Sequence, residues 1–454
     1  MDSNYSGKNH IITLESKAEL IRKMSAKSKN YFENNRLNSS VKTKELQKYC
    51  DFKNLPGFKK LHLHRAVAAQ MGVMNPFFLC HEGVAKDQTY IQGERYLNFS
   101  TYDYLDLNCS APVNQAAVEA VNNYGTSASA SRLVAGERPV HRNLEKALAG
   151  FYQVEDCIVF VSGHATNIWV LCQLFSKEDL IIYDSLIHNS IITGAQFSGA
   201  SRISFPHNNY DRLKEILEEN RTRYKRTVIV TEGLFSMDGD IPDLPRLVEL
   251  KKSYACFLMV DEAHSLGTLG PSGKGVAEHY QMSPDNIDII MGTLSKTLCG
   301  CGGFIAGKQE LVEYLKFTAP GFVYSVGMSP ALAAASLAAL EEMQAQPEKV
   351  KKLQQNSTFC KEYAQSLGLD TGSSTGTAIV PVIVKNSLVA GILTTNLYQR
   401  KINVLPIIYP AVEENAARLR FFLSAAQNSG QIAKALDITA EEYIQAKKTA
   451  EYKQ

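Results

Sequence analysis

The sequence predicts an α/β protein with a mostly parallel central sheet, helices on both faces, and a smaller C-terminal α+β lobe. Two observations lead to this prediction. Short apolar runs alternate with amphipathic stretches between residues 140 and 310, and after Pro330 long helices dominate. Continuous apolar strands that alternate with helices are typical of parallel sheets covered on both faces. A chain of 454 residues, 45% of them hydrophobic, can bury such a core.

Six short apolar runs predict the strands of the large domain: 158–161, 180–183, 228–230, 257–260, 287–291 and 304–306. Amphipathic periodicity predicts helices at 59–71, 211–219, 244–253, 332–343 and 350–367, and a terminal helix after Asp437. Two more strands are expected in the C-terminal lobe, at 378–384 and 418–423.

Charge is distributed unevenly along the chain. Residues 1–74 hold 14 Lys and Arg against 6 Asp and Glu, a balance of +8, so the other residues sum to −6 within the net charge of +2. This asymmetry predicts a basic, partly helical N-terminal extension at 1–74, followed by a large domain at 75–330 and a small domain at 331–454. The nearly neutral total gives no indication of nucleic-acid binding.

Cysteine usage and hydropathy indicate a cytoplasmic protein without a membrane segment. The nine cysteines are scattered with no paired CxxC spacing, as is usual for reduced thiols. No signal peptide is visible, and the most apolar helical stretch, 331–340, is far shorter than the ~20 residues of a membrane span. His62, His64 and His264 are not spaced as metal ligands, so no metal is expected.

Reactive or ligand-binding residue types follow three of the predicted strands. Ligands of α/β sheets bind beyond the carboxyl ends of strands. The turn Ser162–Asn167 opens a helix whose first N–H groups can hold a phosphate. Asp261 places a carboxylate where burial requires a cationic partner. Lys296 lies among hydroxyl residues and glycines, where burial would lower its pKa as imine formation requires. Each signal alone also fits an ordinary turn or a capping side chain.

One segment imitates a nucleotide-binding loop. Gly267–Lys274 has the glycine content of a phosphate loop, but Thr268 stands in place of the first glycine and Gly275 in place of the magnesium-binding Ser or Thr. We interpret it as a flexible loop.

The order of the motifs resembles the α-oxoamine synthase family of fold-type I pyridoxal 5′-phosphate (PLP) enzymes. Asp261-Glu-Ala-His264 precedes Lys296 by 35 residues, and Lys296 ends a Gly-Thr-Leu-Ser-Lys motif. Further matching motifs lie at 184–190, 231–240 and 417–420, and the resemblance covers residues 75–430.

The resemblance implies a homodimer with shared active sites in which Lys296 binds PLP as a Schiff base. Such enzymes condense a small amino acid with an acyl thioester and lose carbon dioxide. Lys296 would also remove the Cα proton, and Asp261 would pair with the pyridinium nitrogen. The other implied site residues are His188 on the ring face, His264 and Ser236 beside the phenolic oxygen and phosphate, Thr293, Gly163 and His164 at the phosphate, Arg420 at the substrate carboxylate, and Ser325, after Tyr324, reaching the partner's phosphate.

Two segments depart from the family pattern. Tyr102–Asp106 stands in place of Asn-Asp-Tyr-Leu-Gly, and 410–417 differs from the usual segment before the arginines. Both segments approach the substrate in the family, so Tyr102 is assigned to substrate binding, and the choice among serine, alanine and glycine stays open.

The stretch 124–132 is most similar to serine-palmitoyltransferase-like and polyketide-associated members. We therefore expect serine-palmitoyltransferase-like activity. The alternatives are activity like that of 8-amino-7-oxononanoate synthase or 2-amino-3-ketobutyrate CoA ligase, an aminotransferase, or a non-catalytic partner subunit. The acyl donor is expected to be coenzyme A or an acyl carrier protein, and the basic extension would suit an acidic carrier.

Overall fold

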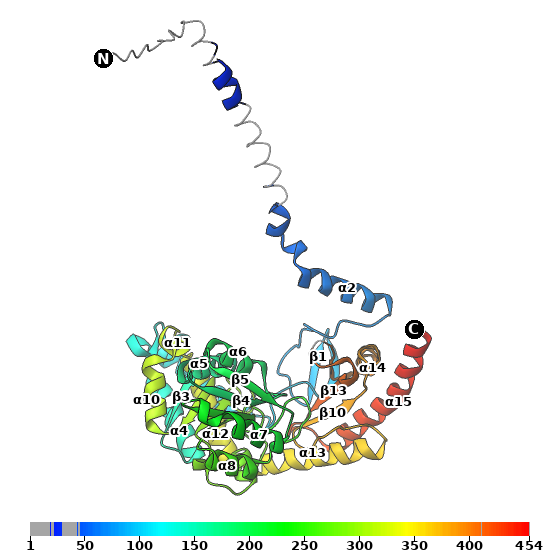
Figure 1. Ribbon diagram of the computed structural model, residues 1–454. Helices are drawn as coiled ribbons and strands as arrows, with labels where there is room; N and C mark the ends of the chain where they lie inside the picture. Colours follow the sequence, from blue (N-terminus) through cyan, green and yellow to red (C-terminus); the bar gives the residue numbers. More distant parts are fainter. Residues whose placement is uncertain (1–18, 20–21, 30–42, 44–45, 410, 454) are drawn as a thin grey trace, which may run out of the picture. The chain divides into compact units, whose positions relative to one another are not determined.

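The computed structural model of the protein describes residues 19, 22–29, 43, 46–409 and 411–453 (Figure 1). These residues form two compact units that divide between Asn75 and Pro76. The N-terminal unit contains α2 (Pro56–Gln70). This helix begins three residues before the predicted start at 59, because Pro56 occupies the first turn, where its missing N–H costs no helical hydrogen bond.

The central sheet has the strand order β3-β9-β8-β7-β6-β4-β5. Its strands are β3 (Asp156–Phe160), β4 (Leu180–Asp184), β5 (Ser201–Phe205), β6 (Thr227–Glu232), β7 (Phe257–Asp261), β8 (Ile289–Thr293) and β9 (Gly303–Gly307). Strands β5, β4, β6, β7 and β8 are parallel neighbours, whereas β9 runs antiparallel to β3 and β8. The predicted, mostly parallel sheet is confirmed. Strand β5 was not predicted, because it lies at an edge, and its half-exposed residues form no continuous apolar run.

Helices cover both faces of this sheet. They are α3 (Ala111–Tyr124), α4 (Pro139–Tyr152), α5 (Gly163–Leu174), α6 (Asn189–Phe197), α7 (Tyr210–Asn220), α8 (Leu244–Ser253), α9 (Val276–His279), α10 (Gln309–Thr318), α11 (Pro320–Val323) and α12 (Pro330–Ala345). Side chains of α5, α6, α10 and α11 share one apolar core with the strands. Figure 1 shows α4, α7, α8 and α12 on the other side.

The C-terminal part is built around a second sheet, in the order β10-β13-β12. Its elements are α13 (Pro347–Ser366), β10 (Ile379–Ile383), α14 (Ser387–Gln399), β12 (Leu405–Ile407), β13 (Arg418–Phe422) and α15 (Ser429–Lys453). The terminal helix begins at Ser429 rather than after Asp437. Asn428 and Gln431 form a reciprocal cap there, because each side chain accepts the other's backbone N–H, at 3.0 and 2.9 Å.

A third small sheet connects distant parts of the sequence. Strand β2 (Glu94–Asn98) pairs antiparallel with β1 (Gln88–Ile91) and parallel with β11 (Ile402–Asn403). The segment that follows contains Asp106, which stands where the family has a glycine. Asp106 adopts φ +54°, a left-handed conformation that glycine favours and that Asp tolerates better than most residues. The domain boundaries at 74/75 and 330/331 stay predictions.

Among the residues that the structure describes, no helix combines the length and the apolar character that a bilayer crossing needs.

Glu145 on α4 anchors a buried ion cluster beside the sheet. Its carboxylate accepts from Arg132 Nη1 at 2.5 Å and from the backbone N–H of Val159 at 3.1 Å, and Lys316 Nζ lies 3.2 Å away. The Glu145 side chain is fully buried. Removal of one partner leaves buried charge uncompensated, which is strongly destabilising.

We predict that Glu145→Ala lowers the free energy of unfolding by about 3 kcal/mol. Urea titration followed by circular dichroism measures the change. Glu215→Ala is the matched control, since Glu215 pairs with Arg212 on the surface of α7 and exposed pairs contribute little. An equal shift of the urea midpoint in both variants would contradict the assigned role of Glu145.

Candidate active site

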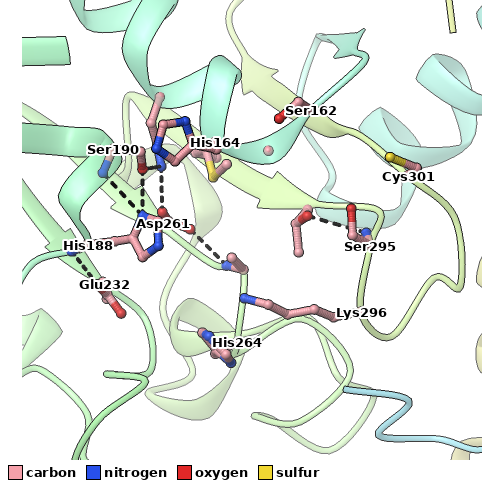
Figure 2. A pocket seen from close by; sticks show the side chains of 15 residues that line it. Ser162, His164, His188, Ser190, Glu232, Asp261, His264, Ser295, Lys296 and Cys301 are labelled. Carbon is pink, nitrogen blue, oxygen red and sulfur yellow. Dashed lines mark hydrogen bonds between the residues drawn. The ribbon is translucent and has the colours of Figure 1, made fainter. Parts of the chain in front are cut away.

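A cavity of about 310 Å³ lies at the carboxyl ends of β6, β7 and β8 (Figure 2). Strand register places Glu232 beside Asp261, and Asp261 beside Met291. This edge is where ligands of α/β sheets bind. Seven residues predicted from the sequence line the cavity: Gly163, His164, His188, Asp261, His264, Thr293 and Lys296.

Asp261 ends β7 with its carboxylate buried in the cavity wall. Its Oδ2 accepts from Asn167 Nδ2 at 2.8 Å, and its Oδ1 accepts from the backbone N–H of Ala263 at 3.0 Å. Both donors are neutral. The ion pairs found among the described residues do not include Asp261. A buried carboxylate in such a place is suited to a cationic ligand group.

Glu232 ends the neighbouring strand β6 and was not predicted as a site residue. Burial, together with the negative charge of Asp261, raises the pKa of Glu232 to about 8. Its Oε1 accepts from the backbone N–H of His188 at 2.7 Å. The strand-end position that singled out Asp261 could also have identified Glu232.

His188 is the residue immediately before α6, and its ring faces the cavity in Figure 2. Its Nδ1 lies 2.7 Å from Ser190 Oγ and accepts from the Ser190 backbone N–H at 3.3 Å. Burial lowers the pKa of His188; the charges of Lys296 and His164 act in the same direction, and that of Asp261 opposes them. The ring of His164 lies edge-on to it, with centroids 6.1 Å apart.

One end of the cavity is formed by the N-terminus of α5. Ser162 caps this helix by accepting from the Ala165 N–H at 3.3 Å. Gly163 is needed because a Cβ there would lie 2.8 Å from Thr293 Oγ1. Ser295 lies beside Thr293, and the backbone N–H of Ser295 donates to Thr293 Oγ1 at 3.3 Å. Backbone N–H groups of a helix start and two hydroxyl groups form a suitable site for an anion.

Lys296 follows β8 and lines both this cavity and a second one of about 320 Å³. Burial lowers the pKa of Lys296 to about 8, against the charges of Asp261 and Glu232, which favour its protonated form. Its Nζ lies 5.8 Å from the ring centroid of Tyr102, which lines the second cavity. The amine is therefore more readily deprotonated than that of an ordinary lysine.

His264 is buried beside Lys296. Its Nδ1 lies 2.7 Å from the hydroxyl oxygen of Tyr104, and its ring stacks on Phe422 at 6.4 Å. Burial and the charges of Lys296 and Arg420 hold the pKa of His264 well below its ordinary value. His264 is therefore neutral around pH 7.

Arg420 on β13 lies outside the lining of the first cavity. Its Nη1 donates to the backbone carbonyl of Ser236 at 2.8 Å, and its guanidinium lies 4.5 Å from the ring centroid of Phe422. Its Nε is buried without a hydrogen-bond partner among the described residues. Such a donor suits an incoming carboxylate.

Two of the predicted cofactor-binding residues are not brought into the cavity. Ser236 does not line it, and contacts Arg420 through its main chain. Ser325 follows α11 beside the exposed Tyr324 and is also absent from the lining residues. Its predicted reach into a partner's site stays a prediction.

The residues that the sequence analysis missed are mainly hydrogen-bonding neighbours of the predicted ones. Asn167, Ser190 and Ser295 all line the cavity. Asn167 lies one helical turn after Gly163, so helical periodicity in the Ser162–Asn167 motif was the available signal.

The glycine-rich segment Gly267–Lys274 is a closed turn rather than a flexible loop. The backbone N–H groups of Ser272 and Lys274 each donate to the Glu278 carboxylate at 3.0 Å, and Gly267 N–H donates to Gly273 at 2.8 Å. The Glu278 carboxylate therefore accepts the backbone N–H groups that a phosphate would need as donors.

Comparisons with known proteins agree with this geometry. The family model for aminotransferase class I and II matches residues 94–438. A protein named 8-amino-7-oxononanoate synthase from Thermoanaerobacter pseudethanolicus is 37% identical over 78% of this chain and 89% of its own length. The chain belongs to the α-oxoamine synthases.

Solved structures of α-oxoamine synthases have the same fold. A structure of serine palmitoyltransferase with PLP has a TM-score of 0.83 and 26% identity, and covers 87% of this chain and 99% of its own. The 8-amino-7-oxononanoate synthase of Francisella tularensis has a TM-score of 0.67 and 30% identity, and covers 76% of this chain and 97% of its own. The expected fold-type I architecture is thereby confirmed.

We predict that Lys296 of the cofactor-free protein reacts with an amine-selective acylating reagent along a pH profile with its midpoint near 8. The reason is that only the neutral amine is nucleophilic, and burial favours that form. Peptide mapping by mass spectrometry at each pH measures the rate. Lys308 is the internal control, because its hydrogen bond to Glu155 raises its pKa. If Lys296 and Lys308 titrate together, the depressed pKa is wrong.

Proposed function

We propose that this α-oxoamine synthase condenses alanine with an acyl thioester, as an enzyme of the 8-amino-7-oxononanoate synthase type. The observation that carries the proposal is the convergence of the Lys296 amine, the buried Asp261 carboxylate and the α5 N-terminus in one cavity. These three groups match the three polar ends of PLP: its aldehyde, its ring nitrogen and its phosphate.

The residues of the cavity fit the cofactor on structural grounds. Asp261 has only neutral hydrogen-bond donors, so it can accept a pyridinium N–H, and the first residues of α5 line the cavity, where their N–H groups can bind a phosphate. Lys296, with its lowered pKa, would hold the aldehyde carbon, and His188 would cover one ring face. Bound PLP supplies an electron sink that stabilises negative charge at the amino-acid Cα.

The chain's own side chains would then divide the work. Lys296 Nζ, once free, is positioned to take the proton from Cα, because its lowered pKa makes it a base near neutral pH. Asp261 would keep a proton on the ring nitrogen. Arg420 would bind the amino-acid carboxylate through its unpaired Nε, and His264, neutral and fixed by Tyr104, would donate to the cofactor's phenolic oxygen.

The names of the relatives bear on the substrate. We expected serine-palmitoyltransferase-like activity from the sequence, but relatives 37% and 39% identical to this chain are named 8-amino-7-oxononanoate synthase and support that alternative better. In 8-amino-7-oxononanoate the carbon C8 carries the amino group and a methyl group, C9, beside the C7 ketone. The amino group, C8 and C9 correspond to alanine after loss of its carboxylate. The structural similarity to serine palmitoyltransferase keeps serine as the second candidate.

We predict that the purified protein with PLP absorbs visible light and releases thiol and carbon dioxide from L-alanine and an acyl thioester. Borohydride should attach PLP to Lys296, and Lys296→Ala should lose both the attachment and turnover. A panel of L-alanine, L-serine and glycine identifies the amino acid. Turnover of 2-oxo acids without thiol release would indicate an aminotransferase, and a wild-type protein that binds no PLP would indicate a non-catalytic subunit.

We propose that the enzyme accepts the acyl group from an acidic acyl carrier protein at least as readily as from coenzyme A. In the described segment 46–70 five Lys and Arg residues stand against Asp51 alone. Exposed apolar side chains, among them Phe52 and Leu63, lie on the same segment. A basic surface speeds encounter with an acidic partner through electrostatic steering. Coenzyme A is also polyanionic, so salt dependence alone does not separate the two donors.

We predict that kcat/KM for one acyl chain is higher on a carrier protein than on coenzyme A at low salt. This advantage should shrink at high salt, on removal of residues 1–50, and in the double variant Lys59→Glu/Lys60→Glu. Steady-state kinetics on both donors measures it. Lys214→Glu/Lys225→Glu is the control, because these exposed lysines lie on the large domain. Equal losses on both donors, or no loss, would exclude this role of the extension.

A homodimer with shared sites is part of the same proposal. Tyr324 is 86% exposed, and Val326 and Val134 are exposed as well. Exposed aromatic and branched apolar side chains of this kind are common at subunit interfaces.

A further inference from the structure

A chain of hydrogen-bonded side chains runs through the wall of the cavity from Asp261 to His188 (Figure 2). Asn167 Nδ2 lies 2.8 Å from Asp261 Oδ2 and 3.0 Å from Ser190 Oγ. Ser190 Oγ in turn lies 2.7 Å from His188 Nδ1. Asn167 and Ser190 are almost completely buried. The chain therefore connects the end of β7 with α5 and the start of α6 through two buried middle members, and only His188, at its far end, is exposed.

The direction of each hydrogen bond follows from the chemistry of its members. The Asp261 carboxylate only accepts, so the atom of Asn167 that faces it must be the amide nitrogen. Its second hydrogen points to Ser190 Oγ. Ser190 Oγ accepts there and is free to donate its own hydrogen to His188 Nδ1.

The backbone supports the same direction at His188. The N–H of Ser190 also points at Nδ1, at 3.3 Å, and an N–H cannot accept. His188 Nδ1 is therefore an acceptor, and the ring hydrogen is on Nε2. The charged groups around the ring are Lys296 and His164, which disfavour an imidazolium, and Asp261, which favours one; burial decides for the neutral form.

We propose that Asn167 is a positioning residue that fixes the Asp261 carboxylate and, through Ser190, holds His188 as its neutral Nε2–H tautomer against the cofactor ring. The inference rests on the proposed PLP site. A neutral imidazole on the ring face adds no second positive charge beside the ring nitrogen, whose proton Asp261 would stabilise. One amide thus connects the two groups that would contact the ring.

One atom of Asn167 has no partner. Its Oδ1 is buried without a hydrogen-bond partner among the described residues, which is unfavourable for folding. Leucine has a similar volume and no such atom, but it also lacks the donor to Asp261 and Ser190. The two effects on the unfolding temperature of Asn167→Leu oppose each other, so the role of Asn167 in the site is tested by the loss of cofactor affinity.

The experiment compares wild type, Asn167→Leu and Ser190→Ala, with Ser198→Ala as the matched control. Ser198 lies just after α6 and its hydroxyl donates to the backbone of Ala195, away from this chain of side chains. Three quantities are measured: the dissociation constant of PLP by absorbance titration of the cofactor-free protein, the pH dependence of the visible band of the holoenzyme, and the unfolding temperature of the cofactor-free protein.

In Asn167→Leu we expect the dissociation constant of PLP to rise by about tenfold or more, since a hydrogen bond to a charged group is lost. In Ser190→Ala we expect a new spectral transition as the pH is lowered, because loss of a donor to Nδ1 raises the pKa of His188. The control should match wild type in all three measurements.

Two failures are distinguishable. If wild type itself binds no PLP, the proposed function falls. If wild type binds PLP but Asn167→Leu binds it equally tightly and Ser190→Ala shows no new transition, the role of Asn167 is wrong and the proposed function stands. A lowered unfolding temperature in Asn167→Leu together with unchanged PLP affinity would show a structural role only.

Discussion

Two carboxyl groups that end neighbouring strands in register impose the main constraint on this site. Glu232 on β6 is paired with Asp261 on β7, and both side chains are buried at the same edge of the sheet. Two adjacent buried carboxylates repel each other, so burial and the charge of Asp261 raise the pKa of Glu232 to about 8. Glu232 is then mostly protonated at neutral pH. The charge of Asp261 favours the protonated amine of Lys296, and the neutral donors of Asn167 and Ala263 hold the Asp261 carboxylate.

The other parts of the site are arranged around this pair. The α5 helix contributes Asn167 to Asp261 and its own N-terminus to the anion end, so one helix serves both ends of the cavity. The Glu232 side chain holds the main chain of His188. From the C-terminal sheet, Arg420 binds the main chain of Ser236, and Phe422 packs against both Arg420 and His264.

The departures from the family pattern lie in segments that the resemblance assigns to substrate binding. Asp106 adopts the left-handed conformation that a glycine favours, so the turn forms without the glycine. Tyr102 is different, because its ring lines the second cavity together with Lys296 and contacts Phe422 edge-on at 4.8 Å. The motifs at the proposed cofactor end follow the family, and we expect selectivity for the amino acid to depend on these few side chains.

The sequence by itself determined six of the seven strands of the central sheet, some of the helices between them and the strand-end positions of Asp261 and Lys296, because apolar runs and strand ends are local signals. It could not determine the antiparallel direction of β9, the edge strand β5, or the parallel pairing of β2 with β11. These features depend on pairing between distant segments. Asn167 and Asp261 are 94 residues apart, and the packing of α5 against the sheet brings Asn167 Nδ2 to 2.8 Å from Asp261 Oδ2. The same holds for Arg420 and Ser236, which are 184 residues apart. Only the tertiary structure decided which side chains meet, because hydrogen bonds of this kind exist only after the sheets have formed.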